Sequence, residues 1–142
     1  MSGPRPKLVL DGTEGIEGRA LMLISALHRR AVRFAGAELA MTTADPPVLA
    51  GLALLRWEKG LDIQVEADPV AALKDASLFA AVAFRDTTHL PLGALRATGV
   101  PALIAIQFPD LSRHAPAALV LQRAAHDPDT LGDVIADALW SR

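Results

Sequence analysis

The chain has no cysteine and no tyrosine among its 142 residues, and aromatic side chains make up only 4% of it. Without cysteine there is no disulfide scaffold, thiolate nucleophile or thiolate metal site, and a cytoplasmic location is favoured. Hydrophobic residues account for 51% of the sequence, mostly small aliphatic ones. This composition is typical of helices packed closely on a sheet.

The sequence also lacks a large excess of positive or negative charge, and it lacks long apolar runs. The formal net charge is only −2, and Arg29, Arg30 and Arg33 form too short a basic cluster for a nucleic-acid surface, so we expect no nucleic-acid partner. The opening MSGPRPKLVLDG lacks the apolar region of a signal peptide. No apolar run approaches the roughly 20 residues that a membrane span needs, so we expect no span.

What the chain does contain is an alternation of strand-like and helix-like segments. The pattern predicts strands at 7–10, 31–43, 61–66, 77–84, 100–106 and 117–122. It predicts helices at 17–30, 46–59, 69–76 and 128–140, and a short small-residue helix before Gly99. Apolar inner strands that alternate with helices indicate a parallel sheet covered on both faces. We therefore expect a flexible tail at 1–6 and, at 7–142, a single Rossmann-like three-layer α/β/α domain with a mainly parallel sheet of five to six strands.

Three of the predicted helices share one start signal, an aspartate followed by a proline. The aspartates are Asp45, Asp68 and Asp127. Aspartate is a good N-cap acceptor, and the missing N–H of proline costs nothing in a first helical turn. Gly60 is expected to end the first of these helices. Trp57 and Trp140 also fall on predicted helices, where core packing is favoured over a role as interface anchors.

In such a sheet, ligands bind beyond the carboxyl ends of the strands, where the connections diverge. The loop DGTEGIEG at 11–18 lacks the glycine spacing of a dinucleotide site and is interpreted as an ordinary turn. A receiver domain would place Asp11 in an acidic pocket, but no lysine follows Lys74, so its chemistry is missing. The histidines have no metal-ligand spacing, and we expect no metal or cofactor. They are His28, His89, His114 and His126.

Residues 68–140 carry a set of motifs in a fixed order: DPVAALKDASLFAAVAF, RDTTHLPLGALRATGVPALIAI and LVLQRAAHDPDTLGDVIADAL. In this order they resemble the C-terminal, donor-binding domain of retaining GT-B glycosyltransferases. That family has an E-G-F-G-L-P-L-L-E-A-M-A-A-G-V-P loop and a D-P-x-x-L-A-x-A-I closing helix. EGRALMLISAL lies where the family has a KG-x-x-x-L-I-x-A-L helix. The positions that match the family loop are Leu90, Pro91, Leu92, Ala97, Gly99, Val100 and Pro101.

The departures from the family pattern concern its ligand-binding positions. The resemblance implies two glutamates, eight positions apart, that hold the donor sugar and the nucleotide ribose; here they are Asp86 and Ala94. Alanine cannot accept a hydrogen bond from a ribose hydroxyl. Thr88 and His89 replace a phenylalanine and a glycine, and their branched side chains crowd the approach to the backbone amides.

The resemblance implies a set of candidate ligand contacts and no catalytic residue in this chain. Arg19 and Arg85 are the nearest cations for a diphosphate. The full set of candidates is Arg19, Arg85, Asp86, Thr87, Thr88, His89 and Leu90. A GT-B enzyme works in a cleft between two Rossmann-like domains, so this domain alone is not expected to be a complete enzyme.

Three functions follow as hypotheses. The first is a degenerate glycosyltransferase-like domain that is non-catalytic alone and acts as a binding or scaffolding module in glycan or polysaccharide biosynthesis. The second is a nucleotide-sugar-binding subunit of a two-chain glycosyltransferase. The third is a Rossmann-like domain with an unrelated ligand or a role in homo-oligomer assembly, because fold alone does not settle function. A protein partner or a second copy is expected, with a nucleotide-sugar as the small-molecule candidate.

Overall fold

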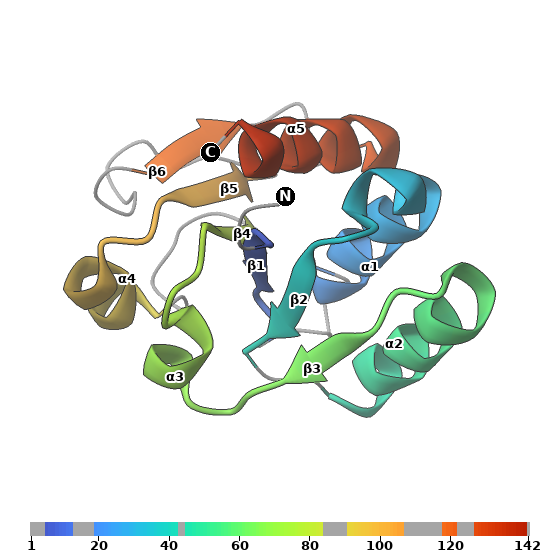
Figure 1. Ribbon diagram of the computed structural model, residues 1–142, viewed down its shortest axis with the longest axis horizontal. Helices are drawn as coiled ribbons and strands as arrows, with labels where there is room; N and C mark the ends of the chain where they lie inside the picture. Colours follow the sequence, from blue (N-terminus) through green and yellow to red (C-terminus); the bar gives the residue numbers. More distant parts are fainter. Residues whose placement is uncertain are drawn as a thin grey trace.

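The computed structural model describes residues 5–12, 19–42, 45–83, 91–106, 118–121 and 127–141. Its centre is a parallel sheet in the order β3-β2-β1-β4-β5-β6 (Figure 1). The strands are β1 Lys7–Leu10, β2 Glu38–Met41, β3 Ile63–Val65, β4 Leu78–Ala83, β5 Ala102–Ile106 and β6 Ala118–Leu121. This is the strand order of a Rossmann fold and differs from the 2-1-3-4-5 order of receiver domains. The predicted α/β class is confirmed.

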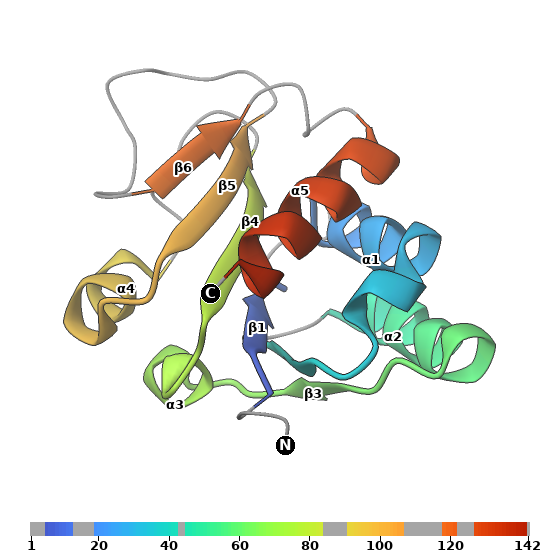
Figure 2. The ribbon, with the colours of Figure 1, turned by 45° about the horizontal axis from the view of Figure 1, so that its top comes forward.

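Helices cover both faces of the sheet. They are α1 Arg19–Arg29, α2 Pro46–Lys59, α3 Pro69–Leu73, α4 Leu92–Thr98 and α5 Pro128–Trp140. In Figures 1 and 2, α1, α2 and α5 lie on one side of the sheet, and α3 and α4 lie on the other. Each layer has its own apolar cluster, with Leu23 and Leu27 of α1 fully buried in the first and Phe79 of β4 fully buried in the second. Alternate residues of β1 and β4 feed the two clusters, as expected for strands buried on both faces.

One predicted strand is wrong over its first half. Residues 31–43 were expected to be extended throughout, but Ala31–Phe34 form a 3-10 helix, η1, and only Glu38–Met41 form a strand. Gly36 turns the chain between them with a φ of 86°, in a region that suits glycine. Phe34 is fully buried. Val32, in contrast, is 90% exposed, so the apolar residues of η1 are not part of a long buried strand.

Three arginines fix η1 and the end of α1 against α5. Arg29 pairs with Asp129, Arg30 bridges Asp129 and Asp133, and Arg33 bridges Asp133 and Asp137. Hydrogen bonds to Asp129 and Asp137 raise the pKa values of Arg29 and Arg33 above their usual value. The three arginines of the basic cluster thus form ion pairs with aspartates of the same chain. Figure 2 shows α1 and α5 side by side along this seam.

The three Asp-Pro pairs begin helices as predicted, but only two of the aspartate side chains cap them. Asp68 accepts from the Val70 N–H at 3.0 Å, and Asp127 accepts from the Asp129 N–H at 3.0 Å. Asp45 makes no such bond. The reason is local, because α2 begins with two prolines and the second removes the N–H that the other two helices offer. Gly60 ends α2 in the left-handed conformation, as predicted.

The expected core packing of the two tryptophans is wrong for Trp57. Its side chain, on α2, is 88% exposed. Trp140, at the end of α5, is 45% exposed and donates its Nε1–H to the Arg33 carbonyl at 2.6 Å. In the described ranges, no helix is long and apolar enough to cross a membrane. The division into a tail and a single domain stays a prediction.

Candidate functional site

The carboxyl edge of the sheet is divided between β1 and β4. From β1 the chain runs through α1 to β2 on one side, whereas β4 and β5 extend the sheet on the other. Connections that diverge in this way leave a crevice outside the carboxyl ends of the two strands, which is where ligands bind in open α/β sheets. Within the described residues, the candidate site is therefore formed by Asp11, Gly12 and Thr42 at the ends of β1 and β2 and by the starts of α1 and α4.

Two polar residues are buried at this edge. Asp11 directly follows β1 and is 2% exposed, and Thr42 directly follows β2 and is 1% exposed. Their backbone N–H groups extend the sheet ladder, since Asp11 donates to the Ala80 carbonyl and Thr42 donates to the Leu10 carbonyl, each at 3.0 Å. The Gly12 N–H donates to Thr42 Oγ1 at 3.4 Å. The start of the loop after β1 is thus held against the end of β2.

Thr42 was not among the predicted site residues. Its signal in the sequence is a change from the apolar run of β2 to the polar pair Thr42-Thr43, which resembles any strand end. Only the strand order shows that this end lies beside the loop after β1. Asp11, considered for a receiver domain alone, lies at the crevice for the same topological reason.

Arg19 is the one predicted ligand contact inside the described ranges. It is the first residue of α1, the helix that the chain enters after β1, and it is partly buried. The first turn of α1 holds no acidic residue. A cation in the first turn is disfavoured by the helix dipole, which attracts anions to that end. Arg85, Asp86, Thr87, Thr88, His89 and Leu90 lie outside the described residues.

The position of the second family glutamate is described and carries a methyl group. Ala94 lies in α4 and packs, partly buried, against the apolar cluster that includes Val9 and Ile104. Its carbonyl accepts a hydrogen bond from Thr98 Oγ1 at 2.8 Å. Gly99 ends α4 in the left-handed conformation, which agrees with the predicted stop. A short helix with a glycine stop is therefore present at Leu92–Thr98, and Ala94 makes an apolar contact at the position where the resemblance implies a carboxylate.

No metal centre is found in the part of the chain that the structure describes. No three histidine or acidic side chains gather there closely enough to hold an ion. His28 instead pairs with Glu58 across α1 and α2, with Nε2 and Oε1 2.9 Å apart. The other three histidines lie outside the described residues.

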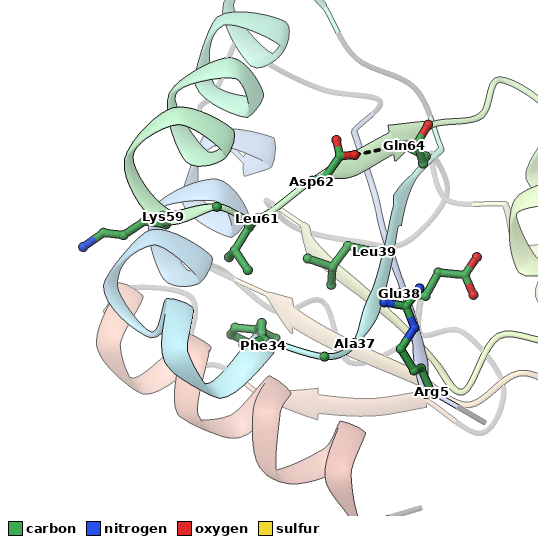
Figure 3. A pocket seen from close by; sticks show the side chains of 12 residues that line it. Arg5, Phe34, Ala37, Glu38, Leu39, Lys59, Leu61, Asp62 and Gln64 are labelled. Carbon is green, nitrogen blue, oxygen red and sulfur yellow. Dashed lines mark hydrogen bonds between the residues drawn. The ribbon is translucent and has the colours of Figure 1, made fainter. Parts of the chain in front are cut away.

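A hollow of about 430 Å³ lies at the opposite edge of the sheet (Figure 3). It is formed where β2 and β3 begin, and charged side chains of both signs line it. These are Arg5, Glu38, Lys59 and Asp62. Asp62 accepts a hydrogen bond from Gln64 Nε2 at 3.2 Å. Lys59 points away from the hollow in Figure 3. The lining offers no field of one sign for a charged ligand, so the crevice at the carboxyl edge is the better candidate.

Comparisons with known proteins find similar folds but no similar sequences. No protein-family model matches the sequence, and no curated protein matches it significantly. Among solved structures, a chain of the GtfA/B complex superposes with a TM-score of 0.63 over 98% of this chain and 30% of that chain, at 13% identity. The glycosyltransferase SnogD from Streptomyces nogalater matches over 100% of this chain and 41% of that chain, with 14% identity and a TM-score of 0.45.

These similarities concern the fold. The chain spans less than half the length of either neighbour. At such low identities the likeness to GtfA/B shows a shared architecture alone, and a TM-score below 0.5 does not establish even that for SnogD. The protein thus has an α/β Rossmann-like fold.

Proposed function

We propose that this chain is a degenerate, donor-type GT-B domain that does not transfer sugars by itself. It acts in the cytoplasm as a binding or scaffolding module for a partner protein in glycan or polysaccharide biosynthesis. The observation that carries the proposal is Ala94, an apolar contact at the position of the ribose-binding glutamate. Loss of a charged hydrogen-bond acceptor costs about 1.5–3 kcal/mol, which is roughly ten- to a hundred-fold in affinity.

Asp11 supports the same proposal. Its carboxyl group is buried at the end of β1, beside the crevice that a nucleotide diphosphate would enter. An aspartate side chain supplies neither the positive charge nor the N–H donors that hold a diphosphate. A site built to hold such a ligand would place cations or free backbone amides at this point. The backbone N–H of Gly12, the next residue, already donates to Thr42 Oγ1.

The partner is supported by the nature of the neighbour. The GtfA/B neighbour belongs to a complex. Under the GT-B resemblance, the reaction takes place between two Rossmann-like domains. We propose that a separate chain presents the other domain and that the carboxyl edge of this sheet faces it.

Nucleotide binding tests the proposal. Thermal unfolding would be followed with millimolar UDP, GDP, ADP and their sugar conjugates. A ligand at 100 times its Kd stabilises by about 2.7 kcal/mol, which raises Tm by several degrees for a domain of this size. We expect no selective rise for the natural chain. A selective rise with one nucleotide would contradict the loss of the site.

Restoring the carboxylate sharpens the test. Ala94→Glu returns the family residue, and Ala97→Glu makes the same charge change at an exposed position of the same helix. We expect a nucleotide-dependent rise in Tm with Ala94→Glu and none with Ala97→Glu. If neither variant gains binding, Ala94 is not the lost ribose anchor.

One observation favours the second function, a nucleotide-sugar-binding subunit. Arg19 begins α1, and both its guanidinium group and the positive end of the helix dipole attract an anion such as a phosphate. Arg19 would then act with Arg85, Thr88 and the neighbouring residues of the 84–90 loop. In this case the natural chain binds a nucleotide, Arg19→Ala abolishes the shift in Tm, and Arg96→Ala, an exposed change on α4, leaves it unchanged.

A further inference from the structure

The outer face of α2 is apolar along almost its whole length. The inner face of the helix buries Val48, Leu52 and Leu55 against α1 and the sheet. The exposed apolar residues of the helix are Pro46, Pro47, Leu49, Ala50, Ala53, Leu54 and Trp57, and the exposed charged residues Arg56, Glu58 and Lys59 lie in its last turn. Leu54 is 51% exposed and Trp57 is 88% exposed. An exposed helix face with this many apolar side chains is normally covered, and Figure 1 shows α2 at the outer margin of its layer.

The first turn of α2 is suited to being covered by protein. The first backbone N–H groups of a helix have no partner inside it, and burying them is costly. Pro46 and Pro47 carry no N–H, so two of these donors are absent. Their rings present an apolar surface instead. A partner can therefore cover this helix end with fewer unsatisfied donors than at a helix without prolines.

The charges beside the apolar face are self-complementary. Helical spacing places Asp45, Leu49 and Arg56 along one flank of the helix, four and then seven residues apart. Asp45 makes no capping bond, and both charged side chains are exposed. A two-fold axis across α2 reverses the direction of a second helix but keeps this flank on the same side. Asp45 of one copy then lies opposite the partner's Arg56. The two-fold axis repeats this contact at the other end of the helix pair.

We propose that α2 is the contact surface for a second copy of this chain, packed as an antiparallel helix pair about a two-fold axis. Trp57 of each copy packs on the prolines at the start of the other α2, and an Asp45–Arg56 pair closes each end. A large exposed tryptophan is the usual centre of such an interface, and the exposed Ala53 and Leu54 lie one turn before it on the same helix. The antiparallel arrangement also sets the two helix dipoles in opposition. This contact does not depend on nucleotide binding at the carboxyl edge.

Sedimentation velocity across a wide range of protein concentration tests the proposal. The natural chain is expected to show a concentration-dependent monomer–dimer equilibrium. Trp57→Glu should weaken it by at least about tenfold in Kd, since it places a charge at the centre of the contact. Val70→Glu is the matched control, because Val70 is 54% exposed on α3, on the other face of the sheet. Both variants should keep the Tm of the monomer.

A charge swap tests the geometry of the pair. Asp45→Arg alone and Arg56→Asp alone should each be monomeric, because each sets like charges opposite one another at both ends. An equimolar mixture of the two variants should dimerise, since opposite charges then meet at both ends of the helix pair. A natural chain that stays monomeric at all concentrations overturns the proposal and leaves this face to a different protein. A dimer that survives Trp57→Glu and both charge variants overturns it as well, because the contact then lies elsewhere.

Discussion

Helices α5 and α2 both pack against α1 on the same face of the sheet, but their other contacts differ. The acidic row on α5 meets the arginines of α1 and η1, so its polar residues are satisfied within the chain. The outer face of α2 exposes leucines and Trp57, and Asp45 and Arg56 beside it have no ion pair within the described residues. The outer side of α5 is thus held by ion pairs within this chain, whereas the outer face of α2 is the surface that we propose a second copy covers.

The largest expected difference between the two helices comes from their glycines. A Cβ on Gly132 of α5 would lie 2.8 Å from the Ala26 carbonyl oxygen, which is backbone and cannot move aside. Overpacking costs about 1–3 kcal/mol, and helix propensity returns at most about 1 kcal/mol. We predict that Gly132→Ala lowers the free energy of unfolding by about 1–2 kcal/mol in urea titrations.

Gly51 of α2 is the matched control. A Cβ there would meet the tip of the Ile24 side chain at 3.0 Å, and this tip can rotate away. Gly51→Ala is therefore expected to be neutral or slightly stabilising. Equal losses for the two variants would show that α5 is not packed more closely on α1 than α2 is.

A smaller difference is expected between the two tryptophans. Trp140→Phe removes the hydrogen bond to the Arg33 carbonyl, which joins the end of α5 to η1. A hydrogen bond of this kind contributes about 0.5–1.5 kcal/mol. Trp57→Phe should leave the unfolding free energy of the monomer unchanged, because the side chain is 88% exposed. Thermal unfolding at low protein concentration measures both, and a loss for Trp57→Phe would place Trp57 in the fold of the monomer.

The fold could be predicted from local signals because apolar runs, Asp-Pro starts and glycine stops each depend on neighbouring residues. Gly60 and Gly99 end their helices where the sequence indicates. The errors arise where distant residues decide the outcome. The 31–34 segment is apolar like a strand, but ion pairs of Arg33 with α5 and the turn at Gly36 favour a 3-10 helix.

The candidate site was less predictable, because it depends on which strand ends are neighbours. Thr42 and Asp11 are far apart in the sequence and share one hydrogen-bonded corner through Gly12. Sequence similarity alone identified Ala94 as a departure, and the structure adds that the residue packs against an apolar cluster. Trp57 was predicted to pack in the core, as a tryptophan on a helix usually does. The sequence does not show which face of that helix points to solvent, and in the structure this side chain is exposed.

The smallest expected effect is the pH dependence of the seam between α1 and α5. Hydrogen bonds from arginine lower the pKa values of Asp129 and Asp133 below the ordinary 3.8, with Arg29 acting on the first and Arg30 on the second. A lowered pKa in the folded state means that the stabilisation is present above 3.8 and is lost as the pH falls through the lower, folded-state value. Asp133→Asn should therefore lower Tm at pH 6–7, and its difference from the natural chain should shrink as the pH falls below 3.8. The pairs are largely exposed, so 1 M salt should also shrink the difference.

Asp45→Asn on α2 is the control, and we expect no pH-dependent difference because that side chain makes no capping bond or ion pair in the monomer. A difference for Asp133→Asn that stays the same at every pH, below 3.8 as well as above it, would mean that the amide disturbs packing rather than an ion pair.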